Sequence, residues 1–214
     1  MSHATPYPKE LVVLVADLDM ENALRGILGR HRALRIRQLA EGENFDILRH
    51  PQRDPGCRGD ADTFLQGFLK THRYALVVFD HHGCGRKSRA ADIESDVEQR
   101  LAKTGWCRRC AAVVIEPELE AWVWSDSPEV ARILGWRAQN PSLRSWLERQ
   151  QLLRPNTPKP EDPKAAMERV LRQTRKPASS RMFSALADSV GLTRCRDRAF
   201  NKLKTALQAW FPLP

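Results

Sequence analysis

The hydrophobic pattern contains three short apolar runs, and a stretch of helical periodicity comes after each of them. The runs cover residues 11–16, 75–79 and 111–115 and consist of Val, Leu, Ala, Ile and Phe. Runs of this length that are rich in β-branched residues predict strands buried on both faces, as in the centre of a parallel sheet. We therefore expect three strands of one sheet.

Amphipathic segments between these runs complete an alternation of strands and helices. Helices are predicted at 22–30, 60–71 and 88–103, where apolar residues recur every three or four positions. Residues 34–39 alternate apolar and basic side chains, which predicts a further strand at an edge of the sheet. Residues 41–59 mix Pro, Gly and charge without a clear period, and we predict mainly loop there. This order predicts an α/β fold with a mostly parallel sheet flanked by helices.

No further strand is predicted after residue 126. The pattern instead predicts helices at 127–134, 142–153, 163–174, 179–189 and 194–211, with a proline-rich connection at 154–164. We expect an α/β domain over residues 1–135 and a helical C-terminal region, 136–214, that packs on it or beside it.

Charge distinguishes these two parts. The chain has a formal net charge of +9, but residues 1–126 hold 18 Lys and Arg against 19 Asp and Glu, whereas residues 127–214 hold 17 against 7. A basic region of this kind predicts a nucleic-acid partner, DNA or RNA. The alternative is a solvated basic surface that serves solubility.

The remaining composition bears on the compartment. No run of about 18 apolar residues and no basic-then-apolar amino terminus is present, so neither a membrane span nor a signal peptide is predicted. The five cysteines, an odd number, suit a reducing compartment better than a disulfide framework. We expect a cytoplasmic protein with no membrane partner.

Acidic residues follow all three apolar runs. Asp17, Asp19 and Glu21 follow the first, Asp80 ends the second, and Glu116, Glu118 and Glu120 follow the third. Because the carboxyl ends of parallel strands meet at one edge of a sheet, these carboxylates should converge there. Converging carboxylates repel one another unless a cation lies between them, which predicts a site for Mg²⁺ or Mn²⁺. The alternative for each acid alone is a loop or helix cap.

Three motifs carry a family resemblance. They are Val15-Ala-Asp17-Leu-Asp19-Met-Glu21, Val77-Val-Phe-Asp80-His-His82-Gly83 and Ile115-Glu116-Pro-Glu118-Leu-Glu120-Ala-Trp122. In this order they resemble the metal-binding TOPRIM domain of topoisomerases, primases and OLD-family nucleases, and especially small TOPRIM-like proteins of bacterial defence islands. The resemblance covers roughly residues 10–135.

The resemblance implies a divalent-metal-dependent, nuclease-like enzyme of anti-phage defence. Asp17, Glu21, Asp80 and Glu120 would be the catalytic acids and metal ligands, with Glu116, Glu118, Asp19 and His82 as outer or alternate ligands.

The chain departs from the family pattern, which has Glu at the first acid, Gly after it, and a second carboxylate where His82 stands. Imidazole suits Mn²⁺ or Zn²⁺ better than Mg²⁺. The alternative function is a non-catalytic nucleic-acid-binding or assembly subunit of a defence complex that keeps a degenerate site.

Two other groups suggest ligands. Arg86, Lys87 and Arg89 follow the glycine turn after Asp80 and are candidate phosphate contacts, although exposed basic residues are also commonly just solvated. His81, His82, Cys84, Cys107 and Cys110 suggest zinc, but a second pair of cysteines with metal-ligand spacing is missing, which disfavours it.

Overall fold

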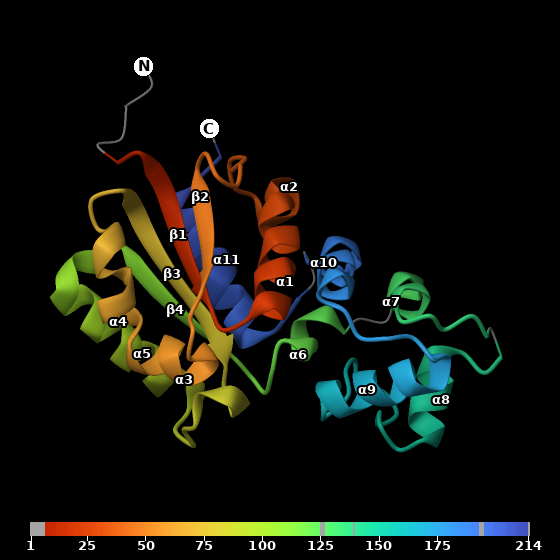
Figure 1. Cartoon of the computed structure of the whole chain (residues 1–214). Helices are drawn as coiled ribbons and strands as arrows, with labels where there is room; N and C mark the ends of the chain where they lie inside the picture. The colour runs from red at the N-terminus through yellow and green to blue at the C-terminus, as the bar shows by residue number, and fades with distance from the viewer. Residues whose placement is uncertain (1–6, 125–126, 139, 193–194, 214) are drawn as a thin grey trace.

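The protein is built around a four-stranded sheet in which every strand is parallel to its neighbours. The computed structural model describes residues 7–124, 127–138, 140–192 and 195–213. The strands are β1 (Lys9–Val15), β2 (Phe45–Arg49), β3 (His72–Asp80) and β4 (Cys110–Ile115), in the spatial order β2-β1-β3-β4 (Figure 1). The predicted fold class, a parallel sheet flanked by helices, is confirmed.

Helices cover both faces of the sheet. They are α1 (Leu18–Gly29), α2 (His31–Leu34), α3 (Arg53–Gly59), α4 (Ala61–Phe64), α5 (Ala90–Leu101), α6 (Glu120–Val123), α7 (Pro128–Ile133), α8 (Leu143–Arg149), α9 (Pro163–Thr174), α10 (Ser180–Ser189) and α11 (Arg198–Trp210). The chain passes from β1 to β2 in one direction and then to β3 and β4 in the other. Right-handed crossovers therefore place α1 on one face, with α11 beside it, and α3, α4 and α5 on the other (Figure 1).

The strand order creates a switch point between β1 and β3. The residues of β1 from Leu11 onward and those of β3 from Ala75 to Phe79 are buried, as expected for central strands. The register pairs Val15 with Val78 and Asp80 with Ile115, so β1, β3 and β4 end at one edge. Ligands of open α/β sheets bind outside the carboxyl ends of strands at such a point.

The prediction of an edge strand at 34–39 is wrong. The short helix α2 ends at Leu34, and Arg35 adopts a left-handed conformation (φ 58°) that stops any extension. Leu34, Ile36 and Leu39 are nevertheless buried, so the apolar spacing reflects packing of an irregular segment. The edge strand is β2, and it lies in the 41–59 segment predicted to be mainly loop, which also contains α3.

Other elements differ mainly in length. The helix predicted at 60–71 is the short α4 followed by a 3-10 turn, Leu65–Phe68, whereas the helix predicted at 163–174 is α9 with the same ends. The predicted domain boundary at residue 135 stays a prediction.

C-terminal helices pack directly on the sheet layer. On α1, a Cβ at Gly26 would lie 3.1 Å from the Cβ of Ala187 in α10, so glycine permits the close approach of the two helices. The Trp210 ring of α11 stacks on Tyr74 of β3 at 4.8 Å. The helices α7, α8 and α9 lie beyond α6 and α10, to the side of the sheet (Figure 1). Among the described residues, no helix is both long and apolar enough to cross a bilayer.

Candidate active site at the strand ends

The site lies at the switch point, where β1 and β3 end. Asp17 follows β1 in an extended conformation, and its Oδ1 accepts a hydrogen bond of 3.0 Å from the backbone N–H of Met20. It is therefore the N-cap of α1, as the capping alternative predicted, and it also lies beside the acids of the neighbouring strand.

Asp80 is the most perturbed carboxylate of the site. Its Oδ1 has no contact with solvent and no hydrogen-bond partner, although other parts of the residue are partly exposed. Burial raises the pKa of Asp80 well above its ordinary value, and the nearby carboxylates of Asp54, Glu120 and Asp17 raise it further, against a lowering effect of the backbone N–H of Leu119. A buried oxygen without a partner is costly, so its retention needs a reason other than stability.

Asp54 faces Asp80 from the start of α3. Its Oδ1 accepts a hydrogen bond of 2.8 Å from the backbone N–H of Asp80. Burial raises the pKa of Asp54, and the carboxylates of Asp17 and Glu118 add to this, against the hydrogen bond from Asp80. A Cβ on Gly83 would lie 2.4 Å from Asp54 Oδ2, so only glycine fits there.

Glu120 completes the group from the first residue of α6. Burial raises its pKa to about 7, with Glu118 and Asp19 adding to the effect and Lys164 opposing it. Lys164 belongs to α9, and its Nζ lies 3.4 Å from Glu118 Oε1. We call Asp17, Asp54, Asp80, Glu118 and Glu120 the acid cluster, and Lys164 is its nearest cation from the C-terminal region.

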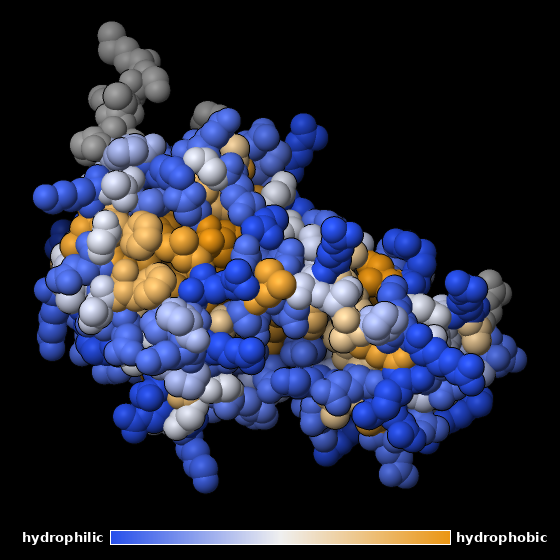
Figure 2. Space-filling model, viewed as in Figure 1, coloured by the Kyte–Doolittle hydropathy of each residue, from blue (hydrophilic) through white to orange (hydrophobic). Residues whose placement is uncertain are grey.

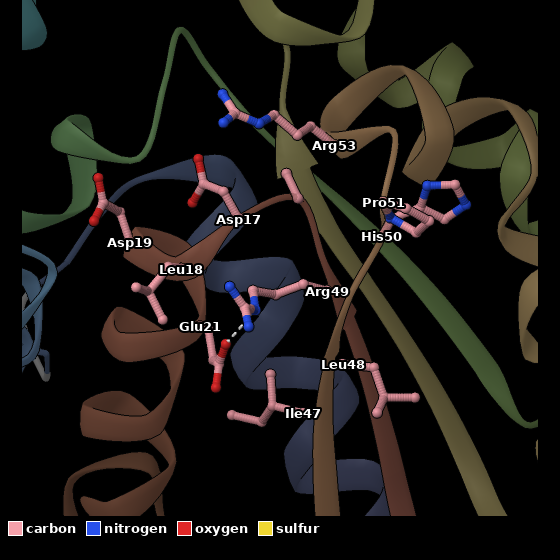
Figure 3. Close-up of a pocket in the computed structure, with 11 residues that line it drawn as sticks. Asp17, Leu18, Asp19, Glu21, Ile47, Leu48, Arg49, His50, Pro51 and Arg53 are labelled. Atoms are coloured by element: carbon pink, nitrogen blue, oxygen red, sulfur yellow. Dashed lines mark ion pairs between the residues drawn. The ribbon is translucent and has the colours of Figure 1, made fainter.

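Two predicted acids face other partners. Glu21 lies one turn into α1, with its carboxylate 2.7 Å from Arg25 and 3.0 Å from Arg49 (Figure 3). Glu116 is exposed and lies 3.4 Å from Arg198 of α11. Both carboxylates are therefore neutralised by arginines, and the structure does not bring them into the acid cluster.

Asp19 lies in the first turn of α1 and contributes to the raised pKa of Glu120. The other predicted ligand and phosphate-contact residues lie on the loop after β3. His82 is exposed, and its ring centroid lies 6.3 Å from that of His81. Arg86, Lys87 and Arg89 are exposed, and Arg89 forms an ion pair of 3.0 Å with Asp92. The space-filling view shows a mainly hydrophilic surface below the strand ends (Figure 2).

The described part of the chain contains no preassembled metal site of three or more ligands. Across residues 7–124, 127–138, 140–192 and 195–213, no three His, Cys, Asp or Glu side chains are arranged as a group that could hold a metal ion. The acid cluster is thus a set of mutually perturbed carboxylates and not a finished coordination shell.

The sequence analysis missed Asp54, Lys164 and Arg53, the residue before Asp54. Asp54 was overlooked because its segment was predicted to be loop, although the short run Phe45–Arg49 before a proline could have indicated a strand end there. Lys164 carried no signal, because it is 44 positions from Glu120 and meets the acids only through the fold.

Comparison with known proteins adds no relative. No family model matches the chain, and no curated protein or solved structure matches it either. The TOPRIM resemblance therefore stays a prediction that depends on three short motifs.

Proposed function

We propose that the acid cluster binds Mg²⁺ or Mn²⁺ and that the protein is a nuclease-like enzyme acting on phosphodiesters of DNA or RNA, in bacterial anti-phage defence. The observation that carries the proposal is the buried, unpartnered Oδ1 of Asp80, surrounded by carboxylates that raise one another's pKa. Such a group is unfavourable in the free protein and is relieved by a cation. Strongly perturbed acids in a cleft at a switch point are typical of functional sites.

The acid cluster has the ligand atoms that a hard cation prefers, but its side chains are not yet arranged around one position. Carboxylate oxygens are the ligands that Mg²⁺ and Mn²⁺ prefer, and the acid cluster offers them from α1, α3, β3 and α6. Because the described side chains form no finished group of three, binding requires the carboxylates of the acid cluster to move closer together.

Each residue then has a distinct part. Asp17, Asp80 and Glu120 would hold the cation, and Asp54 orients Asp80 through its hydrogen bond to the backbone N–H. When bound, the cation supplies an acidified water and stabilises charge on a phosphoryl oxygen. Because a metal ligand must be deprotonated and the pKa of Glu120 is about 7 in the free protein, binding of the cation should release a proton near neutral pH.

A second function is favoured by a different observation. The absence of a finished group of three ligands among the described residues, together with Lys164 beside Glu118, suits a protein that keeps the strand-end acids without using a metal. Such a protein would be a non-catalytic nucleic-acid-binding or assembly subunit, in which the basic C-terminal region contacts phosphates.

Thermal unfolding of the wild type and of Asp80→Asn, in EDTA and in millimolar Mn²⁺ or Mg²⁺, separates these functions. The enzyme should gain about 5 °C in Tm with metal. Asp80→Asn should lose this gain and all cleavage of labelled DNA or RNA, yet be at least as stable in EDTA because it relieves repulsion. Glu116→Gln, outside the acid cluster, is the control.

A wild type with no metal-dependent shift and no cleavage would contradict the enzymatic proposal. Salt-sensitive, metal-independent binding of nucleic acid by that same protein would support the second function.

A further inference from the structure

A pocket of about 710 Å³ opens beside the acid cluster and shares Asp17 with it. It is formed by the start of α1, the end of β2 and the start of α3 (Figure 3). Its volume is in the range of sites that hold a small ligand or one nucleotide unit. Asp54 and Asp80 do not line this pocket, which therefore extends from Asp17 away from the most buried acids.

Two arginines line the pocket, and they differ in whether a carboxylate pairs with them. Arg49 is held 3.0 Å from Glu21 Oε2, so its charge is already compensated. Arg53 is exposed, and no carboxylate of the described residues lies within ion-pairing distance of its guanidinium. Its side chain extends across the pocket toward Asp17 (Figure 3). Arg53 is thus the arginine of this pocket that is available to an external anion.

The backbone places Arg53 and Asp54 in opposite directions. Arg53 has φ 52°, a left-handed conformation that is uncommon for a residue other than glycine. The next residue, Asp54, turns inward to the N–H of Asp80. Arg35, Arg108 and Arg175 adopt the same conformation, so it does not by itself mark a site. Here the conformation sends a carboxylate into the acid cluster and a guanidinium into the pocket.

We infer that Arg53 binds the phosphate adjacent to the one that is cleaved, and hence that the substrate is a polynucleotide with at least two phosphates in sequence. The inference deepens the proposed function and depends on it. A guanidinium binds phosphate oxygens through two parallel hydrogen bonds, which fixes the register of a strand as well as holding it. Arg53 and Asp17 both line the pocket, so a strand lying in it would meet the strand-end acids and the guanidinium in turn.

The kinetic test compares two substrates with Arg53→Ala, Arg53→Lys and Arg108→Ala. Arg108 is a matched control, because it is an exposed arginine with φ 59° that precedes β4 at the opposite end of the sheet. The substrates are a 12-nucleotide single strand, DNA or RNA as the wild type requires, and bis(4-nitrophenyl) phosphate, which has one phosphodiester. Arg53→Ala should raise KM for the oligonucleotide about tenfold with kcat unchanged, and should leave cleavage of the small diester unaltered. Arg53→Lys should recover part of the loss.

A decrease for both substrates would place Arg53 on the cleaved phosphate and overturn the inference. An oligonucleotide KM that matches that of Arg108→Ala would overturn it as well.

A binding measurement in EDTA distinguishes failure of this inference from failure of the proposed function. Fluorescence anisotropy of the same oligonucleotide should show about tenfold weaker binding by Arg53→Ala, with the salt dependence reduced by about 0.7 in log–log slope for one phosphate. This result with an inactive wild type supports the Arg53 contact and rejects the enzyme. Arg53-dependent binding of a nucleoside triphosphate but not of the oligonucleotide would reject the polynucleotide.

Discussion

Carboxylates gather against the sheet in two regions of the protein. In one region they pair with cations of the fold, and in the other most of them do not. At the edge strand β4, Glu94 and Glu98 of α5 meet Arg198 and Lys202 of α11. At the strand ends, the one ion pair that the described residues make with the acid cluster joins Glu118 to the half-exposed Lys164. The first group is compensated from within the fold, and the second is not.

The compensated group satisfies its buried atoms. Glu94 is 2% exposed, accepts a hydrogen bond of 2.8 Å from Val114 N–H, and lies 2.9 Å from Arg198 and 3.2 Å from Lys202. Glu98 accepts from the N–H of Ala112 in the same way at 2.9 Å. These glutamates accept hydrogen bonds from N–H groups on the open side of the edge strand β4. Those N–H groups are therefore not free to pair with another chain.

The uncompensated group leaves Asp80 Oδ1 without a partner, although this chain places arginines on carboxylates elsewhere. A buried acid without a cation either keeps a proton, as the raised pKa of Asp80 favours, or takes a cation from solution, as the proposed function requires. This comparison supports the metal proposal independently of the sequence motifs.

The largest expected effect is on the compensated group. Arg198→Met should lower the free energy of unfolding by about 2 kcal/mol, because it leaves the carboxylate of Glu94 buried with one fewer cation. Urea denaturation measures it. Arg89→Met, which removes an exposed ion pair with Asp92, should cost less than about 0.5 kcal/mol. Equal losses for the two variants would remove the distinction between buried and exposed pairs on which the comparison depends.

An intermediate effect is expected from pH on the uncompensated group in EDTA. Glu120 has a pKa of about 7 in the folded protein and an ordinary value near 4.5 when unfolded. Between these values the folded state keeps a proton that the unfolded state releases, so this group lowers stability as pH rises from 4.5 to 7. Glu120→Gln should match the wild type near pH 4.5 and exceed it by about 1–2 kcal/mol above pH 7.5.

The difference in Tm between Glu120→Gln and wild type, followed across pH, isolates this contribution from other titrating groups. Glu43→Gln, at an exposed glutamate, should show no such trend. A pH-independent difference for Glu120→Gln would mean that the strand ends do not perturb this carboxylate. Adding Mn²⁺ should reverse the order of stability, because the variant lacks a ligand.

The sequence predicted the strands that are buried on both faces better than the strand that is not. The strands β1, β3 and β4 were predictable because burial on both faces requires a continuous apolar run, which few other structures require. The edge strand β2 has only Phe45 buried, so its five residues carry little signal. The alternation at 34–39 was more regular but belongs to an irregular segment.

The same difference decided which site residues could be predicted. Asp17, Asp80 and Glu120 lie at or shortly after the ends of strands that were predicted, and Asp17 and Glu120 lie close enough to Asp80 to raise its pKa. Glu21 was expected beside them, but it pairs with Arg25 of its own helix and with Arg49 of β2, whose position was not predicted. Asp54 and Lys164 reach the site from α3 and α9, through contacts that no local pattern encodes.

The smallest expected effect tests Lys164 as a competing cation. Lysine is unfavourable in the first turn of a helix, yet Lys164 occupies the second position of α9, with its Nζ directed to Glu118. Its charge opposes a divalent cation at the same acids, so Lys164→Met should tighten Mn²⁺ binding by about three- to tenfold in calorimetric titration. Because Lys164 is half exposed, the free energy of unfolding in EDTA should fall by less than about 1 kcal/mol.

Arg169→Met on the exposed side of the same helix supplies the control, since it removes equal charge without a contact to Glu118. Tighter binding specific to Lys164→Met would show that the C-terminal region sets the cation affinity of the strand-end acids. Weaker binding would instead make Lys164 part of the structure that holds Glu118 in place. Unchanged binding would mean that the charge of Lys164 does not affect the affinity for the cation. Lys164 would then not compensate the charge of the acid cluster.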